Sequence, residues 1–462
     1  MCNTFLSSPD QWAQAEFGFA PLGDTRRNKR LIKVATSLAA NPGGTLPQAL
    51  PEWAELKAAC RLLNQQRVTF ERIQTPHWER TLQASRQPGE YLLIEDTTVL
   101  DFSLRPGCEG LGVIGDGRGR GFELHSTLAV RIEGWTLEQR PEGTLLGLLY
   151  QQCCAPRPAP KGEKRGERLS RARRSDKWAQ AIRRVGRPPQ ETHWIYCGDR
   201  ESDIYEAIQT CQQHGVDFVV RSCQDRRLAE PAGHLRETVA RASRLGRTTV
   251  EVRARAGQPA RTAIVEVRCV QVALDGPWRP GGMRPPLAGV GVVEVQEVDA
   301  PEGVKEPLHW ILLTSLPCDT WAQGQRIVGC YTARWWIEEY HKALKSGAKV
   351  EESQLEQASR LECLIAILAV VAVRLLHTKM LARSRPETFE AASSFGKEML
   401  GLLERKLGRP KGGWNNRNLI RAIARIGGFI GRKSDGEPGW QNIWRGWQRL
   451  QWMCAGANLM ED

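Results

Sequence analysis

Two short runs of strand-forming residues, far apart in the chain, each lead into an aspartate. The first, YLLIEDTTVLDF from Tyr91, carries Asp96. The second, THWIYCGD from Thr192, ends in Asp199 and is followed at once by the helical pattern ESDIYEAIQTC. Runs of this length and composition predict buried strands. Because reacting groups collect at the carboxyl ends of strands in α/β sheets, we expect both aspartates at such strand ends, along one edge of a sheet.

The two aspartates are candidate metal ligands. Convergent carboxylates suit Mg²⁺, a hard cation that prefers oxygen ligands and keeps several waters. Two such ions about 4 Å apart can activate a water or hydroxyl and stabilise the leaving oxygen of a phosphodiester. A single aspartate at a strand end is more often a helix cap or a turn residue, so these runs alone leave Asp96 and Asp199 as weak candidates.

A segment downstream, YTARWWIEEYHKALKSG at residues 331–347, is more informative. At about 100° per residue, one helix places four polar residues in a stripe roughly 60° wide, with a second lysine beside it. These residues are Tyr331, Arg334, Glu338, Lys345 and, beside the stripe, Lys342. The opposite side is apolar and carries Ala333, Trp336, Tyr340, Ala343 and Leu344.

This stripe has two interpretations. Arg334 and Glu338 at i,i+4 can be an ordinary surface pair, worth only about 0.2–0.5 kcal/mol. Alternatively, Glu338 binds a metal ion among groups that hold phosphate, which also explains the tyrosine and the lysines.

The N-terminal part, residues 10–85, has apolar positions at helical spacing. It opens with a basic cluster, Arg26, Arg27, Lys29 and Arg30, in which phosphate contacts and a solvated face are equally good interpretations.

Residues 156–189 carry twelve Arg or Lys against three acids, and we expect a loop-rich basic insertion that is disordered without a partner. Strand-like alternation over 221–316 predicts a mostly antiparallel insertion, and helices are expected from Asp319 onward.

The formal charge of +13 attracts polyanions, of which nucleic acid is the commonest, although charge alone does not exclude a basic protein without a specific partner. The thirteen cysteines include no Cys-x-x-Cys pair, which argues against a zinc finger, and their odd number favours reduced thiols in a cytosol over disulfides. The longest apolar stretch, Cys363 to Val373, is too short for a membrane span of about twenty residues, so we expect a buried core helix and no membrane partner.

The order Tyr331-x2-Arg334-x3-Glu338-x6-Lys345 resembles the signature of the insertion-sequence-four family of bacterial DDE transposases, and most closely its hairpin-forming, transposon-five type. Other segments resemble the family in the same order and over nearly the whole chain. They are LGDTRRNKRLIKVA, IEDTT at Asp96, CGDRESDI at Asp199, FVVRS at Arg221, WILLTS at Trp310 and IARIGGFIGRK…GWQNIWRGW.

The resemblance implies an α/β fold with a ribonuclease H-like (retroviral-integrase-like) catalytic core, a β-rich insertion and flanking helical domains. The implied domains are an N-terminal DNA-binding domain at 1–75, a catalytic domain at 76–375 with its insertion at about 222–316, and a dimerisation domain at 376–462. It further implies double-stranded DNA at transposon ends and target as partner, a homodimer in the synaptic complex, and a cytoplasmic, nucleoid-associated bacterial protein.

The resemblance also implies roles for single residues. Asp96, Asp199 and Glu338 would be the catalytic metal ligands for two Mg²⁺ ions, with Mn²⁺ as a substitute. The phosphate-holding residues would be Tyr331, Arg334, Lys345, Arg221 and Lys342. Trp310 would stack on a flipped base with support from Trp335, although a tryptophan buried in a strand is an equally good interpretation of Trp310 without the resemblance. Arg26, Arg27, Lys29 and Arg30 match the family's N-terminal DNA-contacting helix.

The implied reaction is a series of in-line displacements at phosphorus. Water nicks the 3′ end of the element, the freed 3′-OH attacks the opposite strand to form a hairpin, water opens the hairpin, and the 3′-OH attacks target DNA. Two other hypotheses remain: a catalytically silent DNA-binding regulator derived from a transposase, and a plain nuclease that leaves no joined products. Three intact carboxylates argue against the regulator.

Overall fold

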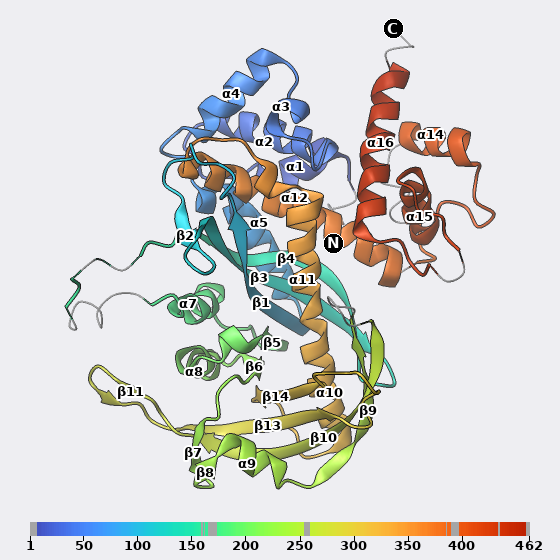
Figure 1. The fold of residues 1–462 in the computed structure, drawn as a ribbon. Helices are drawn as coiled ribbons and strands as arrows, with labels where there is room; N and C mark the ends of the chain where they lie inside the picture. Colours follow the sequence, from blue (N-terminus) through green and yellow to red (C-terminus); the bar gives the residue numbers. More distant parts are fainter. Residues whose placement is uncertain are drawn as a thin grey trace.

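The computed structural model describes residues 7–158, 160, 162–164, 173–253, 259–384, 386–389, 397–432 and 435–458. N-terminal helices lie at the top of Figure 1, a long sheet runs from the middle to the bottom, and the C-terminal helices lie at the right. Part of the basic segment expected at 156–189, residues 165–172 among it, lies outside the described residues.

The N-terminal part is helical, as its periodicity predicts. Its helices are α1 (Pro9–Phe17), α2 (Thr25–Ala40), α3 (Leu46–Ala49), α4 (Trp53–Leu63) and α5 (Phe70–Ser85). Helix α2 begins after Asp24, whose side chain accepts the backbone N–H of Arg26 at 2.8 Å. Such an N-cap satisfies one of the donors that a helix start leaves free, which explains why the basic cluster begins a helix here.

One sheet of twelve strands forms the centre of the protein. Its strands are β1 (Gly89–Asp101), β2 (Gly112–Ile114), β3 (Gly119–Trp135), β4 (Pro141–Cys154), β5 (Thr192–Gly198), β6 (Asp217–Arg221), β7 (Arg227–Glu230), β8 (Gly233–His234), β9 (Arg244–Val252), β10 (Arg261–Leu274), β13 (Leu287–Glu297) and β14 (His309–Thr314). Their order is β2-β3-β1-β5-β6-β14-β13-β10-β7-β8, with β4 on β3 and β9 on β10. Among the named strands of the described residues, β1–β5 and β5–β6 are the parallel pairs. A small separate hairpin joins β11 (Trp278–Arg279) to β12 (Gly282–Met283).

The insertion predicted between residues 221 and 316 extends this same sheet. Strand β14 pairs antiparallel with β6, placing Leu313 opposite Val220. Beyond β14, strands β13, β10, β9 and β7 continue with antiparallel pairing, so the predicted strand type is confirmed. The insertion is therefore tied to the strand that follows Asp199 by backbone hydrogen bonds.

The prediction of a loop-rich, disordered insertion at 156–189 is wrong over its last part. Residues Asp176–Val185 form helix α7, which packs beside α8 (Tyr205–His214). Its buried face includes Trp178 and Ile182, which join a cluster with Tyr91 and Trp194 of the sheet. The basic residues hid an apolar face at helical spacing, and that face stabilises the helix by burial.

The segment expected as one helix at 331–347 is divided into three pieces. Helix α10 (Trp321–Ala333) ends before Arg334, α11 (Trp335–Lys342) follows, and a π-helical turn η3 covers Ala343–Gly347. The single straight helix predicted from periodicity is thus wrong in detail. Interruptions of this kind are frequent at functional sites, because they re-aim side chains.

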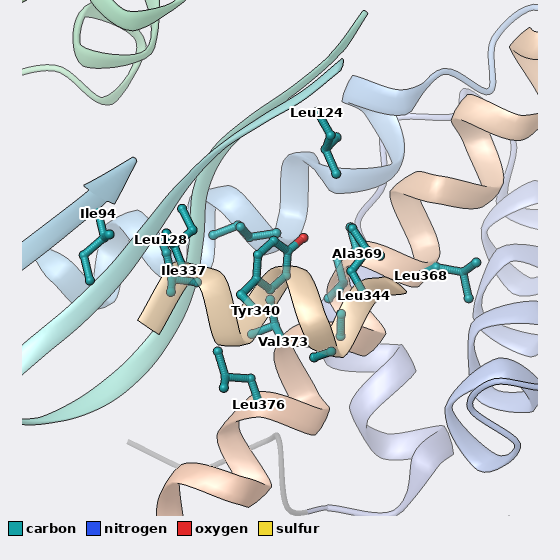
Figure 2. Packing of buried hydrophobic residues seen from close by; sticks show 14 of the residues in the cluster. Ile94, Leu124, Leu128, Ile337, Tyr340, Leu344, Leu368, Ala369, Val373 and Leu376 are labelled. Atoms are coloured by element: carbon teal, nitrogen blue, oxygen red, sulfur yellow. The ribbon is translucent and has the colours of Figure 1, made fainter. Parts of the chain in front are cut away.

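Helix α12 (Ala358–Ser384) contains the longest apolar run of the chain. Its Ala358–Met380 segment is long and apolar enough to cross a membrane, and 78% of its most apolar window is buried inside the protein. All residues from Cys363 to Val373 are buried, as expected for a core helix. Figure 2 shows Leu368, Ala369 and Val373 of this helix beside Tyr340 and Leu344 of the preceding segment.

The C-terminal helices form a small core of their own. They are α14 (Lys397–Leu407), α15 (Asn416–Ile426) and α16 (Trp440–Asn458), packed around Leu403, Leu419 and Ile423. Of the helically spaced tryptophans in α16, Trp444 is buried and Trp447 packs against this core. A short helix, α9 (Leu235–Ala240), lies within the insertion.

Candidate active site

The pairing of β1 with β5 brings Asp96 and Asp199 together. The parallel register ends at Glu95 opposite Gly198, and each aspartate is the next residue of its strand or loop. Strand β1 does not end at Asp96 as expected, because it continues to Asp101 on its pairing with β3. Asp96 therefore lies within β1, at the level where the neighbouring strand β5 ends. The two aspartates meet there as expected, although β1 itself continues further.

Asp199 also has the role of a cap. Its Oδ1 accepts the N–H of Glu201 at 2.8 Å and so begins the 3₁₀ turn η2 (Arg200–Ser202). A carboxylate has two oxygens with several lone pairs, so one capping hydrogen bond leaves acceptor capacity on Asp199.

Arg334 bridges two of the predicted carboxylates. Its Nη1 lies 3.2 Å from Oδ2 of Asp96, and its Nη2 lies 3.0 Å from Oε1 of Glu338. Burial raises the pKa of Asp96 to about 7, Arg334 opposes this rise, and the charges of Asp199 and Glu338 add to it. The three predicted acids thus share one electrostatic environment, in which Arg334 is the counter-charge.

The site contains a residue that sequence reasoning missed, His341. Ligand atoms of Asp96, Glu338 and His341 all lie within 4.8 Å of one another, whereas Asp199 does not belong to this group. Burial lowers the pKa of His341 to about 3, helped by Lys345 and Arg334, so the ring is neutral. The signal was the spacing Glu338-x-x-His341, because residues at i,i+3 share one face of a helix.

A buried polar network holds α11 on the sheet. The Nε2 of Gln151 on β4 lies 2.8 Å from the hydroxyl of Tyr340 and 2.8 Å from Oγ of Ser126 on β3. Gln74 of α5 donates to Oε1 of Gln151 at 2.8 Å. Figure 2 shows Tyr340 pointing inward beside Ile337 and Leu128. These buried hydrogen bonds join α11 to β3, β4 and α5, and so fix the helix that carries Glu338 against the sheet.

Beside the carboxylates, a cleft of about 610 Å³ opens between the core and the insertion. Six of the predicted site residues line it: Arg221, Trp310, Tyr331, Arg334, Trp335 and Glu338. Trp310 meets Tyr331 edge to face at 4.9 Å, and Arg221 hydrogen-bonds the Tyr331 side chain. Residues from β6, β14 and α10 are thus in contact, as a shared substrate-holding surface requires.

Four further arginines line this cleft that the sequence reading did not single out. They are Arg140, Arg200, Arg253 and Arg261. Arg253 stacks over the Trp335 ring at 4.0 Å, which places the insertion against α11. These four arginines are scattered along the sequence, and only the fold brings them together in the cleft. With Arg221 and Arg334 they give the cleft six arginines, which outnumber its four glutamates, Glu138, Glu251, Glu306 and Glu338.

The two predicted lysines, Lys342 and Lys345, are not among the residues that line the cleft, although Lys342 contacts one of them. Lys342 extends over the Trp335 ring at 4.8 Å. Lys345 lies in the π-helical turn, 3.7 Å from Oε1 of Glu351. Trp335 donates from Nε1 to Oε1 of Glu339 at 3.0 Å, which orients its ring along the cleft.

The N-terminal basic cluster is partly engaged within the protein. Arg27 donates to the carbonyl of Leu22 at 2.8 Å, and Arg30 pairs with Glu55. Arg26, with 90% of its side chain exposed, forms a pair with its own cap residue, and Lys29 is exposed. None of the four residues is among those that line the cleft beside the carboxylates.

Three transposase families match the chain in order. Residues 9–68 match the family described as Transposase DNA-binding, residues 175–374 match Transposase DDE domain, and residues 370–461 match Transposase Tn5 dimerisation domain. The DDE match contains Asp199 and Glu338 and begins after Asp96.

One solved structure is similar over most of the chain. It is described as a cryo-EM structure of a piggyBac transposase synaptic complex with hairpin DNA. The two share 10% identity over 94% of this chain and 76% of that one, with a TM-score of 0.33, too low for a common fold to follow.

The family matches confirm the resemblance read from the sequence motifs. The DNA-binding, DDE and dimerisation families, in this order, make up the architecture of Tn5-type transposases, and the chain is a DNA transposase of this type in the insertion-sequence-four family.

Proposed function

We propose that this transposase moves its element by cut-and-paste, binding the terminal inverted repeats, cutting through a DNA hairpin and joining the freed 3′-OH to target DNA. The observation that carries the proposal is the convergence of Asp96, Asp199 and Glu338 beside a basic cleft that contains Trp310. Carboxylates alone fit many hydrolases. Carboxylates beside a basic, aromatic cleft fit phosphodiester chemistry on DNA.

The proposed catalytic core is ribonuclease H-like. Strands β4, β3, β1, β5 and β6 lie side by side in that order, with the first three antiparallel and the last two parallel to β1. This arrangement, with α7 and α8 packed on one face, supports a ribonuclease H-like core that carries its first acid on the central strand.

The residues fit divalent metal. The site offers two carboxylates and an imidazole close together, with Asp199 adjacent, and Arg334 is the cation that contacts both carboxylates. We propose that Asp96, Asp199 and Glu338 hold two Mg²⁺ ions, for which Mn²⁺ can substitute. When bound, such ions lower the pKa of an attacking water and stabilise the charge on the leaving oxygen.

The remaining residues bind and orient the DNA in this proposal. Arg221 and Tyr331, already in contact, hold a phosphate of the transposon end, with Arg334 beside them. Lys342 at the end of α11 and Lys345 in the turn η3 contact phosphates further along the DNA. Trp310 stacks on the base that leaves the duplex when the 3′-OH attacks the opposite strand, and Trp335 supports the same base. Each later step repeats an in-line displacement at phosphorus on the same residues.

We further propose the domain division 1–75, 76–375 and 376–462, with a homodimer in the synaptic complex. The matches to a DNA-binding family at 9–68 and a dimerisation family at 370–461 support this division. The candidate contacts to transposon-end DNA are then Arg26, Arg27, Lys29 and Arg30. Arg27 and Arg30 would have to release their partners within the protein, Leu22 and Glu55, to contact the DNA. The protein would work in the bacterial cytoplasm, at the nucleoid.

The test is the Asp96→Asn variant on labelled DNA that carries the element's own end repeats. We expect nicking to be abolished and end binding to remain, because the change removes charge and keeps shape. Asp101→Asn, on the same strand but with an exposed side chain, is the matched control and should nick normally. Cleavage retained by Asp96→Asn would refute the assignment, and binding without cleavage by the wild type would favour a catalytically silent regulator.

A further inference from the structure

His341 stands one helical turn after Glu338 and faces the same site. Its ligand atom lies within 4.8 Å of carboxylate oxygens of both Asp96 and Glu338. The three residues come from two elements, strand β1 and helix α11, that packing and the Tyr340 network hold together. The geometry therefore presents one nitrogen and two oxygen donors around a common point.

The imidazole of His341 is buried and incompletely bonded. Only 7% of the residue is exposed, and its Nε2 has no hydrogen-bond partner among the described residues. Buried polar side-chain atoms nearly always have a partner, so an unpartnered nitrogen on a ring that lies beside two carboxylates calls for an explanation. Packing alone does not supply one, because the ring of Tyr340 lies tilted at 5.6 Å and offers no acceptor to Nε2.

The neighbouring groups do not supply the missing partner either. Arg334 and Lys345 are the nearby cationic donors, but Arg334 hydrogen-bonds Asp96 and Glu338, Lys345 lies 3.7 Å from Oε1 of Glu351, and neither is bonded to Nε2 of His341. A neutral imidazole nitrogen without a proton is an acceptor, and it is also the form that coordinates metal ions. A cation that Asp96 and Glu338 attract would give this nitrogen its partner.

We propose that His341 is a metal ligand, which makes the Asp96–Glu338 position of the active site a mixed nitrogen and oxygen site. The inference rests on the proposed metal-dependent function and adds a ligand that the carboxylate triad does not include. Asp199, which lies outside the three-donor group, serves the other ion position with Asp96.

A mixed site has a consequence for metal choice. Carboxylate and water suit both Mg²⁺ and Mn²⁺, whereas imidazole suits transition metals, whose affinities for a given site rise from Mn²⁺ toward the later metals. The Asp96–Glu338–His341 position should therefore bind Mn²⁺ more tightly than Mg²⁺. Replacing His341 should reduce this difference in affinity between the two ions. Loss of even an outer-shell partner weakens metal binding about 10–100-fold, so loss of this ligand should weaken Mn²⁺ binding at least about tenfold.

The experiment is pulsed electron paramagnetic resonance on the full-length protein loaded with Mn²⁺ alone. We expect modulation from a directly bound ¹⁴N nucleus in the wild type, its loss in His341→Gln, and its retention in His125→Gln. His125 is the matched control, because it is a second buried imidazole close to His341 that lies outside the three-donor group. Titration of the free Mn²⁺ signal gives the affinity of each variant, and circular dichroism checks that each is folded.

The possible results distinguish the proposed role of His341 from the proposed metal-dependent function on which it rests. Mn²⁺ bound by the wild type without ¹⁴N coupling, or with coupling that His341→Gln leaves unchanged, overturns the role of His341 while the carboxylate site stands. The wild-type spectrum decides this even if His341→Gln fails to fold. Absence of any Mn²⁺ binding that depends on Glu338, tested with Glu338→Gln, would contradict the proposed metal site and the inference together.

Discussion

The indole Nε1 of Trp440 donates a hydrogen bond of 2.9 Å to Oε2 of Glu339. This contact joins the first residue of α16 to α11, directly beside Glu338. Glu339 also pairs with Lys379 of α12 and accepts from Trp335. Burial alone would raise the pKa of Glu339, but Lys379 and the indole donors lower it to about 2. The two adjacent glutamates thus have different roles. Glu338 faces the site, whereas Glu339 contacts residues of α11, α12 and α16 and holds these three helices together.

Glu339→Gln should destabilise the protein strongly. The change leaves the Lys379 ammonium, with only 7% of its side chain exposed, without its carboxylate, and breaking a buried pair costs about 3–5 kcal/mol. Urea unfolding measures the effect. Glu338→Gln on the same helix is the control and should change the free energy of unfolding little, so equal losses in both would contradict the division of tasks.

Arg334→Ala should make the folded protein depend more on divalent metal. Arg334 neutralises Asp96 and Glu338 together, so without it a bound cation becomes their main counter-charge. A metal ion that binds only the folded protein adds about 2.7 kcal/mol to the free energy of unfolding when its concentration is a hundred times its Kd. At a fixed metal concentration, a lower Kd increases this stabilisation. We expect Mg²⁺ to raise Tm more in this variant than in the wild type. Arg140→Ala, which removes a cleft arginine away from these carboxylates, should show the wild-type shift, and an equal shift in Arg334→Ala would speak against the bridge.

Trp310→Ala should impair hairpin formation more than the first nick. Stacking on a flipped base is worth about 1–3 kcal/mol, and 1.4 kcal/mol corresponds to about tenfold in rate. Pre-nicked transposon ends on a denaturing gel isolate the hairpin step. Trp278→Ala, an exposed tryptophan in the β11–β12 hairpin, is the control. Equal slowing of nicking and hairpin formation would assign Trp310 to packing against Tyr331 instead.

The stability of the sheet should depend on pH through His193. Hydrogen bonds to Asp217 and then Glu90 raise the pKa of His193 to about 9. A group whose pKa rises on folding stabilises the fold fully below its unfolded value, about 6.5, and this contribution is lost as pH rises through 9. The free energy of unfolding should therefore fall from pH 6.5 to 9 in the wild type and fall less in His193→Gln. A parallel decline in both proteins would exclude His193 as the cause.

Much of the site could be predicted from the sequence because its signals are local. Glu338 and Arg334 are close in the chain, and their i,i+4 pair forms as the helical spacing indicates. The second partner of Arg334 could not be predicted in this way. Asp96 lies 238 positions away in the chain, and only the packing of α11 on β1 brings the two into contact.

The predictions that failed did so where tertiary pairing outweighs local pattern. Strand β1 runs past Asp96 because β3 continues to pair with it, which a single strand's composition does not reveal. The helix breaks at Arg334, where the Arg334 side chain contacts Asp96 of β1 while Tyr331 contacts Trp310 of β14. Helix α7 was hidden by basic residues whose apolar neighbours, Trp178 and Ile182, decide the structure by burial.

The most direct test of the account is incubation of the purified protein with labelled DNA that carries the repeats flanking its own gene, with and without Mg²⁺. We predict hairpin ends and strand-transfer products that require Mg²⁺ and disappear in Glu338→Gln. Bound ends without any cleavage, or cleavage that persists in Glu338→Gln, would contradict the assignment of Asp96, Asp199 and Glu338 as the site that cuts and joins DNA.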